Sequence, residues 1–130
     1  MGYYDADVYH QPEKFGLTQV AFIDYSSGNY EFDFRIVWRT SSGLLLTARD
    51  AGCSCPSPFE TYTDLRELDL VDYDELEAEC ADKMSGGYAY GPSSLTVADF
   101  LRNVRVALRD SVTRSEAEQY IEARVSHLAQ

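Results

Sequence analysis

The sequence predicts an α+β domain in which a three-stranded antiparallel β-meander precedes a set of helices. The first observation is the run from Tyr30 to Arg39, where large apolar residues occupy every second position and charged residues mostly lie between them. Strand side chains alternate between faces, so this run places an aromatic row on one face. The second is the turn-forming composition of residues 26–29 and 40–43, which flank the run. The third is apolar residues at helical spacing near the end of the chain.

The composition describes a single acidic domain. The chain has 130 residues, with 22 acidic and 11 basic side chains and a net charge of −11. This charge opposes direct binding of nucleic acid or anionic lipid, because phosphate is bound by Lys and Arg. It is compatible with a basic protein partner. No apolar run approaches the roughly 20 residues of a membrane helix, and no secretory leader is recognisable, so we expect a cytoplasmic protein without a membrane partner.

We divide the chain into an N-terminal aromatic arm, residues 1–14, and a single α+β domain, residues 15–130. The predicted strands, each bounded by turn residues, are 15–25, 30–39 and 44–49. The first strand is partly apolar on both faces, so we expect helices on one face and the arm on the other. The rings of Phe32, Phe34 and Trp38 are expected to form the floor on which the C-terminal helices rest.

An irregular loop follows the third predicted strand at residues 50–59. Pro56 and Pro58 lack backbone donors, so neither a helix nor a central strand continues through them. Phe59 is expected to close this loop as an apolar plug. Residues 64–70 fit either a helical turn or a short edge strand.

An acidic helix is the next predicted element. Nine acidic residues and one arginine lie in the segment 64–82. A helix is predicted over 73–83, because Asp72 can cap it and because Asp74 and Glu75 suit the positive end of the helix dipole. Plentiful carboxylates mostly form a solvated face; acid–base chemistry would need two of them placed in one cleft.

Two amphipathic helices are predicted at the end of the chain. The first spans about 96–111, and the second follows a capping box formed by Thr113 and Glu116. They are close in sequence, so we expect a helical hairpin packed on the sheet. A basic stripe on the first helix could hold phosphate, contact the acidic segment or be solvated; it consists of Arg102, Arg105 and Arg109.

Few residues suggest chemistry. Cys53 and Cys55, with Cys80 downstream, are weak candidates for a metal site, since zinc usually takes four ligands in two close pairs. The alternative is that the cysteines act as small, semi-buried apolar residues. No catalytic residue and no cofactor is predicted, because the only histidines are His10 and His127 and no phosphate-binding glycine pattern is present.

Two segments carry a resemblance to a known group of proteins. They are Tyr9-His10-Gln11-Pro12-Glu13-Lys14-Phe15-Gly16 and Gly52-Cys53-Ser54-Cys55-Pro56-Ser57-Pro58-Phe59-Glu60. With the strands between them, they resemble an uncharacterised small-protein family of actinobacteriophages, mycobacteriophages in particular. The resemblance covers about the first half of the chain. It implies a phage origin and a host-cytoplasm setting, transfers no catalytic residue, and marks the arm and the loop as candidates for a shared surface.

We therefore expect a non-enzymatic phage accessory protein that binds a host or phage protein through its acidic surface and its Cys-Ser-Cys-Pro loop. The candidate binding residues are Cys53, Cys55, Pro56, Pro58, Phe59, Asp72, Asp74, Glu75 and Glu79. One alternative is a small metal-stabilised protein built on Cys53 and Cys55, and another is an acidic nucleic-acid mimic. The ten tyrosines also leave a homo-oligomer open, since tyrosine is enriched at interfaces.

Overall fold

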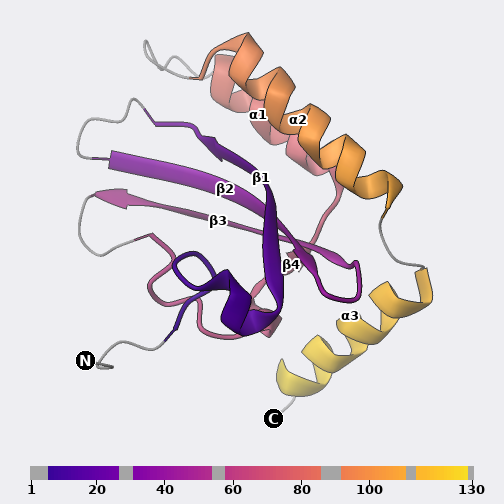
Figure 1. Cartoon of the computed structure of the whole chain (residues 1–130). Helices are drawn as coiled ribbons and strands as arrows, with labels where there is room; N and C mark the ends of the chain where they lie inside the picture. Colours follow the sequence, from indigo (N-terminus) through magenta and orange to yellow (C-terminus); the bar gives the residue numbers. More distant parts are fainter. Residues whose placement is uncertain (1–5, 27–30, 54–57, 86–91, 111–113, 129–130) are drawn as a thin grey trace.

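A computed structural model describes residues 6–26, 31–53, 58–85, 92–110 and 114–128 of the chain. The strands are β1 (Leu17–Asp24), β2 (Glu31–Thr40), β3 (Leu45–Cys53) and β4 (Asp69–Leu70). The α-helices are α1 (Tyr73–Ser85), α2 (Ser94–Arg109) and α3 (Arg114–Leu128), and the 3-10 helices are η1 (Pro12–Phe15) and η2 (Leu65–Glu67). The strands form one antiparallel sheet in the order β1-β2-β3-β4 (Figure 1).

The α+β class is confirmed, but the predicted number of strands is wrong by one. The fourth strand, β4, pairs with β3 through Leu46 opposite Leu70 and Thr47 opposite Asp69. A strand of two residues shows no alternation, so its pattern cannot be told from that of a helical turn. The ambiguous segment in fact contains both structures, η2 and then β4.

Different parts of the chain cover the two faces of the sheet. On one face, Ile36 and Trp38 of β2 are fully buried with Val8, Phe59 and Leu68. On the other face, α1 and α2 bury a second cluster, which consists of Ala21, Ile23, Tyr25, Val37, Leu76, Cys80, Val97, Phe100 and Val104. The expected division, with helices on one face and the arm on the other, is therefore confirmed.

The aromatic row of β2 does not support the helices, contrary to the prediction. Trp38 packs edge-on against Phe59, with ring centroids 5.8 Å apart, and Phe34 lies 5.7 Å from Tyr9 of the arm. The helices instead cover the charged side of β2, on which Val37 is the one apolar residue. Alternation defines two faces, but it does not say which face receives the helices; here ion pairs to α1 make the charged face the one they cover.

A β-bulge in β1 separates apolar residues that share the same sequence parity. The pairing of β1 with β2 shifts register between Gln19 and Ala21. Leu17 consequently lies in the cluster under the arm, whereas Ala21 and Ile23 lie in the cluster under the helices. An extra residue in one strand turns the following side chains to the opposite face.

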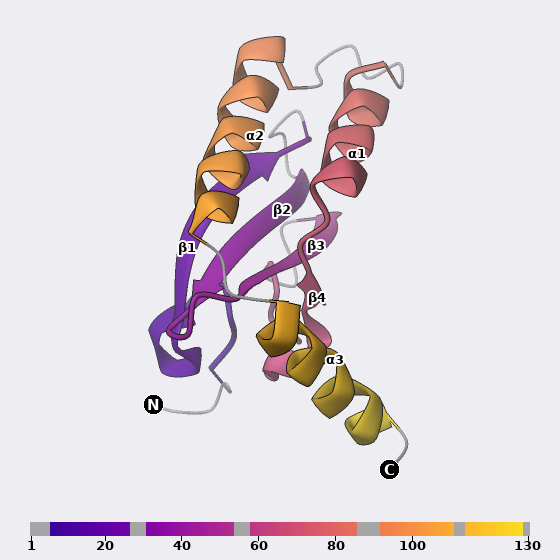
Figure 2. The same ribbon diagram turned by 90° about the vertical axis from the view of Figure 1, so that its right-hand side faces the viewer.

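The prediction of a C-terminal hairpin on the sheet is wrong in its choice of helices. Helices α1 and α2 lie side by side over the sheet, and α3 lies apart from them, against η2 (Figure 2). Leu76 and Cys80 of α1 are buried beside Phe100 of α2, so α1 occupies the place expected for α3. On α3, Ile121 and Val125 remain exposed.

Replacing Trp38 by alanine tests the placement of the aromatic row. Trp38 is fully buried against Phe59, so Trp38→Ala is expected to lower the free energy of unfolding by about 3–5 kcal/mol. The control is Phe22→Ala. Because Phe22 is 39% exposed, this substitution is expected to lower the free energy of unfolding by only about 1 kcal/mol. Urea unfolding measures both variants, and equal losses would contradict the assignment of Trp38 to the core.

Candidate functional site

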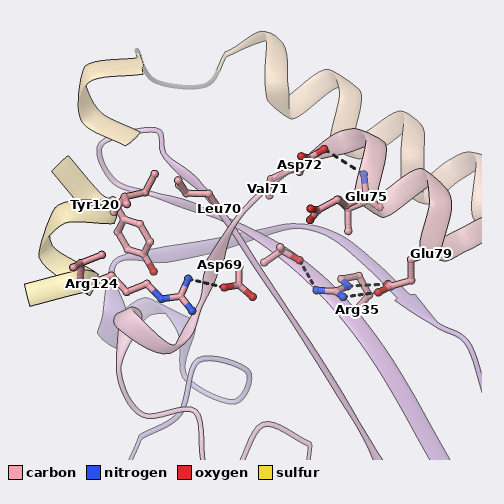
Figure 3. Close-up of a pocket in the computed structure, with 13 residues that line it drawn as sticks. Arg35, Asp69, Leu70, Val71, Asp72, Glu75, Glu79, Tyr120 and Arg124 are labelled. Atoms are coloured by element: carbon pink, nitrogen blue, oxygen red, sulfur yellow. Dashed lines mark hydrogen bonds and ion pairs between the residues drawn. The ribbon is translucent and has the colours of Figure 1, made fainter. Parts of the chain in front are cut away.

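A pocket of about 790 Å³ lies between the β4 edge of the sheet, the start of α1 and α3 (Figure 3). Its floor is formed by Arg35 of β2 and Thr47 of β3. Three of the predicted binding residues line one side of it, namely Asp72, Glu75 and Glu79. The pocket therefore brings part of the predicted acidic surface together with residues distant in sequence.

Local structure explains the position of the carboxylates at the start of α1. The pairing of β4 with β3 sets Asp69 beside Thr47, and the chain then enters α1 after three further residues. Asp72 caps the helix as predicted, since its carboxylate accepts a hydrogen bond of 3.2 Å from the Glu75 amide. Figure 3 shows the Glu75 side chain directed towards Val71 and the pocket.

A half-buried ion pair joins the pocket floor to α1. Two nitrogens of Arg35 donate to the two carboxylate oxygens of Glu79, at 2.9 and 2.5 Å. Tyr25 donates a third hydrogen bond of 2.7 Å to the same carboxylate. Burial acts to raise the pKa of Glu79, but the hydrogen bonds from Arg35 and Tyr25 outweigh burial and hold that pKa below its usual value. Glu79 therefore stays ionised and bound.

A second charge cluster lies beside the first on the same sheet face. Asp33 accepts hydrogen bonds from Arg49 at 2.6 and 2.8 Å and from Lys83 of α1 at 3.1 Å. Burial opposes ionisation of Asp33, but these donors lower its pKa below the usual value. The charges of β2 that face α1 are thus neutralised within the fold rather than left for a ligand.

Two side chains of α3 hold this helix at the pocket. The Tyr120 hydroxyl lies 2.6 Å from the carbonyl oxygens of both Leu65 and Leu68, which share its single proton in a bifurcated hydrogen bond. Burial raises the pKa of Tyr120 to about 12, so the hydroxyl remains a donor at neutral pH. Arg124 donates to Asp69 at 2.6 Å. These contacts present one side of α3 to the pocket.

The charges that line the pocket do not cancel. It is lined by four carboxylates, Asp69, Asp72, Glu75 and Glu79, and by two guanidinium groups, Arg35 and Arg124. Both arginines are paired with a carboxylate, at Glu79 and Asp69. Within the described residues, Asp72 and Glu75 form no ion pair, so the pocket carries two net negative charges that a cationic group can neutralise.

The described lining of the pocket presents carboxylates, guanidinium groups, hydroxyls and apolar side chains. Its described lining contains no cysteine, serine or histidine that could act as a nucleophile or an imidazole base. A search of the described residues also finds no group of three or more His, Cys, Asp or Glu side chains arranged to hold a metal ion. The lining therefore offers a ligand carboxylates and apolar side chains within one pocket.

The loop residues of the predicted site are distributed differently. Cys53 is exposed at the end of β3, and Pro58 is half-buried. Cys55 and Pro56 lie outside the described residues. Cys80, considered as a third cysteine ligand, is buried under α2 and accepts or donates a hydrogen bond of 3.4 Å with Tyr25. Its position in the core agrees with the reading of this cysteine as a small apolar residue.

Phe59 is the apolar plug that the sequence suggested. Its ring is fully buried and contacts Trp38, Tyr9 and Tyr62. The Phe59 backbone has a φ of 58°, which is uncommon for a residue with a bulky side chain. Its amide donates a 2.8 Å hydrogen bond to Asp50, which helps to hold this conformation. The Phe59 ring is therefore part of the core.

Sequence reasoning did not assign the rest of the pocket. The other lining residues are Arg35, Thr47, Asp69, Leu70, Val71, Leu76, Tyr120, Ile121, Arg124 and Val125. The spacing of Tyr120 and Arg124, four residues apart, indicated a shared helical face. It did not indicate that this face would meet η2 and β4, because that contact depends on tertiary structure.

The fold and the pocket define the class of protein: a small α+β domain with a four-stranded antiparallel sheet and an acidic pocket at its edge. A family model described as "Domain of unknown function (DUF7574)" matches residues 6–114, and the chain therefore belongs to this family. The match takes in the sheet, α1 and α2, and it ends at Arg114, where α3 begins.

Other comparisons add no relative. Neither the comparison with curated proteins nor that with solved structures found a match. Over the described parts of the chain, no helix combines the length and apolar character required to cross a bilayer.

The Glu79 ion pair predicts a pH-dependent loss of stability. Glu79→Gln leaves Arg35 without its counter-charge and is expected to lower the free energy of unfolding by about 1–3 kcal/mol at pH 7. Because the folded pKa of Glu79 is depressed, its contribution is present above about pH 4.3, the unfolded value, and is lost as the pH falls through the folded pKa.

Denaturant titrations at several pH values measure this effect. The difference between wild type and Glu79→Gln should be largest near neutral pH and should shrink in acid. Glu77→Gln, an exposed change on the same helix, is the control and should have little effect. A Glu79→Gln difference that is constant between pH 7 and pH 3 would contradict the assignment.

The Tyr120 hydroxyl predicts how α3 is retained. Tyr120→Phe removes the hydrogen bonds to Leu65 and Leu68, so local opening of α3 should become easier by about 0.5–1.5 kcal/mol. Hydrogen exchange should then be faster across α3, with that of β2 unchanged. Tyr73→Phe, which removes a hydroxyl contact to Arg105 on α2, is the control and should leave α3 unaffected.

Proposed function

We propose that this protein is a non-enzymatic binding module that recognises a basic region of a partner protein through the acidic surface of α1. This surface consists of the exposed carboxylates of Asp72, Asp74, Glu75, Glu77 and Asp82. In keeping with the phage resemblance of the arm and the loop, the partner is a host or phage protein in the host cytoplasm.

One observation carries the proposal: the acidic segment contains more carboxylates than the fold binds. Glu79 is occupied by Arg35 and Tyr25, and Asp69 by Arg124. In contrast, the five carboxylates of the acidic surface are exposed and form no ion pair with any described residue. A dense field of one sign attracts and orients an oppositely charged partner.

The loop after β3 is the second proposed contact. Cys53 is exposed at its start, and Phe59 anchors its end in the core. Resemblance to the phage family supports this contact, because the loop is one of the two segments that carry it.

A charge-neutralised variant tests the acidic surface. Tagged protein is used to capture partners from an actinobacterial lysate at about 0.1 M salt and again at about 0.5 M, where the Debye length falls below about 5 Å. A partner recovered by wild type should be released at high salt. It should not be recovered by Asp74→Asn/Glu77→Gln/Asp82→Asn.

The control removes the same number of charges elsewhere. Glu13→Gln/Glu31→Gln/Glu122→Gln changes three exposed carboxylates outside α1 and should retain the partner. Equal loss in both triple variants would mean that total charge matters rather than this surface. Capture that resists both salt and the α1 changes would overturn the proposal, and a captured DNA-binding protein displaced by DNA would favour the nucleic-acid mimic instead.

A further inference from the structure

We propose that the pocket between α1 and α3 receives a short segment of the partner in which a basic side chain lies next to an apolar one. This inference rests on the proposed function and names the chemical feature that the partner must present. The basic group would meet Asp72 and Glu75, and the apolar group would pack against Ile121 and Val125 of α3.

The two sides of the pocket differ in chemistry. The α1 side presents the carboxylates of Asp72 and Glu75. The α3 side presents Ile121 and Val125, which are 48% and 59% exposed although both are large and apolar. They are four residues apart and so occupy one helical face. Contiguous apolar residues that are exposed beside polar groups are typical of grooves that bind another molecule.

The charges of the pocket select the sign of the ligand. An anion would compete with Glu79 for Arg35 or with Asp69 for Arg124, and the carboxylates of Asp72 and Glu75 would repel it. A cation disrupts neither pair. It gains the two carboxylates, Asp72 and Glu75, that form no ion pair within the described chain. Arginine and lysine also carry aliphatic stems that pack on apolar surface while the charged group stays near water.

The size of the pocket favours a peptide segment over a simple ion. At about 790 Å³ it falls within the range of about 300–1,000 Å³ that holds ligands of many atoms. A single metal ion or ammonium group would leave most of that volume to water. Two adjacent side chains and their backbone use both the carboxylate side and the apolar side.

The apolar side lies beyond the region that the family model matches. Ile121 and Val125 belong to α3, whereas the carboxylate side and the floor lie within residues 6–114. The domain of the family thus supplies the charge, and α3 supplies the apolar contact. The proposed recognition of a basic residue beside an apolar one therefore needs α3 as well as the region that the family model matches.

Small amidated dipeptides test the inference directly. The probe is N-acetyl-leucyl-arginine amide, followed by methyl NMR of the full-length protein. It should shift the signals of Val71, Leu76, Ile121 and Val125. The citrulline analogue keeps the shape of arginine without its charge and should bind about tenfold more weakly. The glycyl-arginine analogue should also bind more weakly, because it lacks the apolar side chain.

Matched variants locate the binding. Asp72→Asn/Glu75→Gln should weaken the probe about tenfold, and asparagine keeps the helix cap. Ile121→Ser/Val125→Ser should weaken it as well. Glu13→Gln/Glu31→Gln removes two exposed carboxylates outside both the pocket and the acidic surface and should leave the affinity unchanged.

The outcomes separate this inference from the proposed function. No shift of the pocket methyl groups at about 10 mM probe, where a millimolar site is mostly filled, would overturn the inference. Equal binding of the citrulline analogue, or equal weakening by the control variant, would do the same. If the pocket variants still capture the partner in a salt-sensitive way, the acidic surface stands and the pocket does not. If the triple variant of α1 captures the partner normally and the pocket variants do not, the pocket is supported and the acidic surface is not.

Discussion

The position of α1 depends on two ion pairs that cross from β2. Glu79 meets Arg35, and Lys83 meets Asp33. Glu79 and Lys83 are one helical turn apart, about 6 Å along the axis. Arg35 and Asp33 are two strand residues apart, about 6.6 Å. The spacings match only if the helix runs opposite to the strand, so the four residues fix both the direction and the register of α1.

Half-buried ion pairs add little net stability, because desolvation offsets their attraction; breaking one is costly. Their contribution here is to set where the acidic helix lies, and the pocket and the acidic surface follow from that.

The helices can cover the charged face of β2 because other segments bury its aromatic face. The N-terminal segment and the residues around Phe59 pack on the aromatic face. Val8 is fully buried, and its amide donates to the Tyr62 carbonyl at 3.0 Å. Asp7 binds the amides of Tyr9 and His10 at 2.9 and 2.7 Å, which fixes the turn into η1. These short irregular segments cover the large rings of β2. On the opposite face, Val37 and the neighbouring residues of β1 provide the apolar contacts for α1 and α2.

How far the sequence could predict this structure varies with the range of the interactions. Alternation located β2, and local capping located the start of α1 at Asp72, because both signals lie within a few residues. The bulge in β1, the two-residue β4 and the displacement of α3 from the sheet left no periodic signal. The pocket combines residues from β2, β3, β4, α1 and α3. Only three of its four carboxylates, Asp72, Glu75 and Glu79, were predicted as binding residues, because the charge density of this segment is visible locally. Arg35 and Arg124 became interpretable only once the fold placed each beside a carboxylate.

The carboxylates of α1 can be divided by what the fold requires of them. Asp72 caps the helix, Asp74 and Glu75 lie in its first turn, and Glu79 binds Arg35. Glu77 lies close enough to Arg105 of α2 for their charges to attract. Asp82 has no such role: it is exposed and lies near the helix C-terminus, where the dipole disfavours a negative charge. Neighbouring like charges on a helix destabilise it by a few tenths of a kcal/mol per pair. Folding alone would therefore favour a neutral or basic residue in place of Asp82. A carboxylate kept at a cost to helix stability supports the proposal that α1 contacts a partner, and the adjoining pocket is the place where we propose that this contact begins.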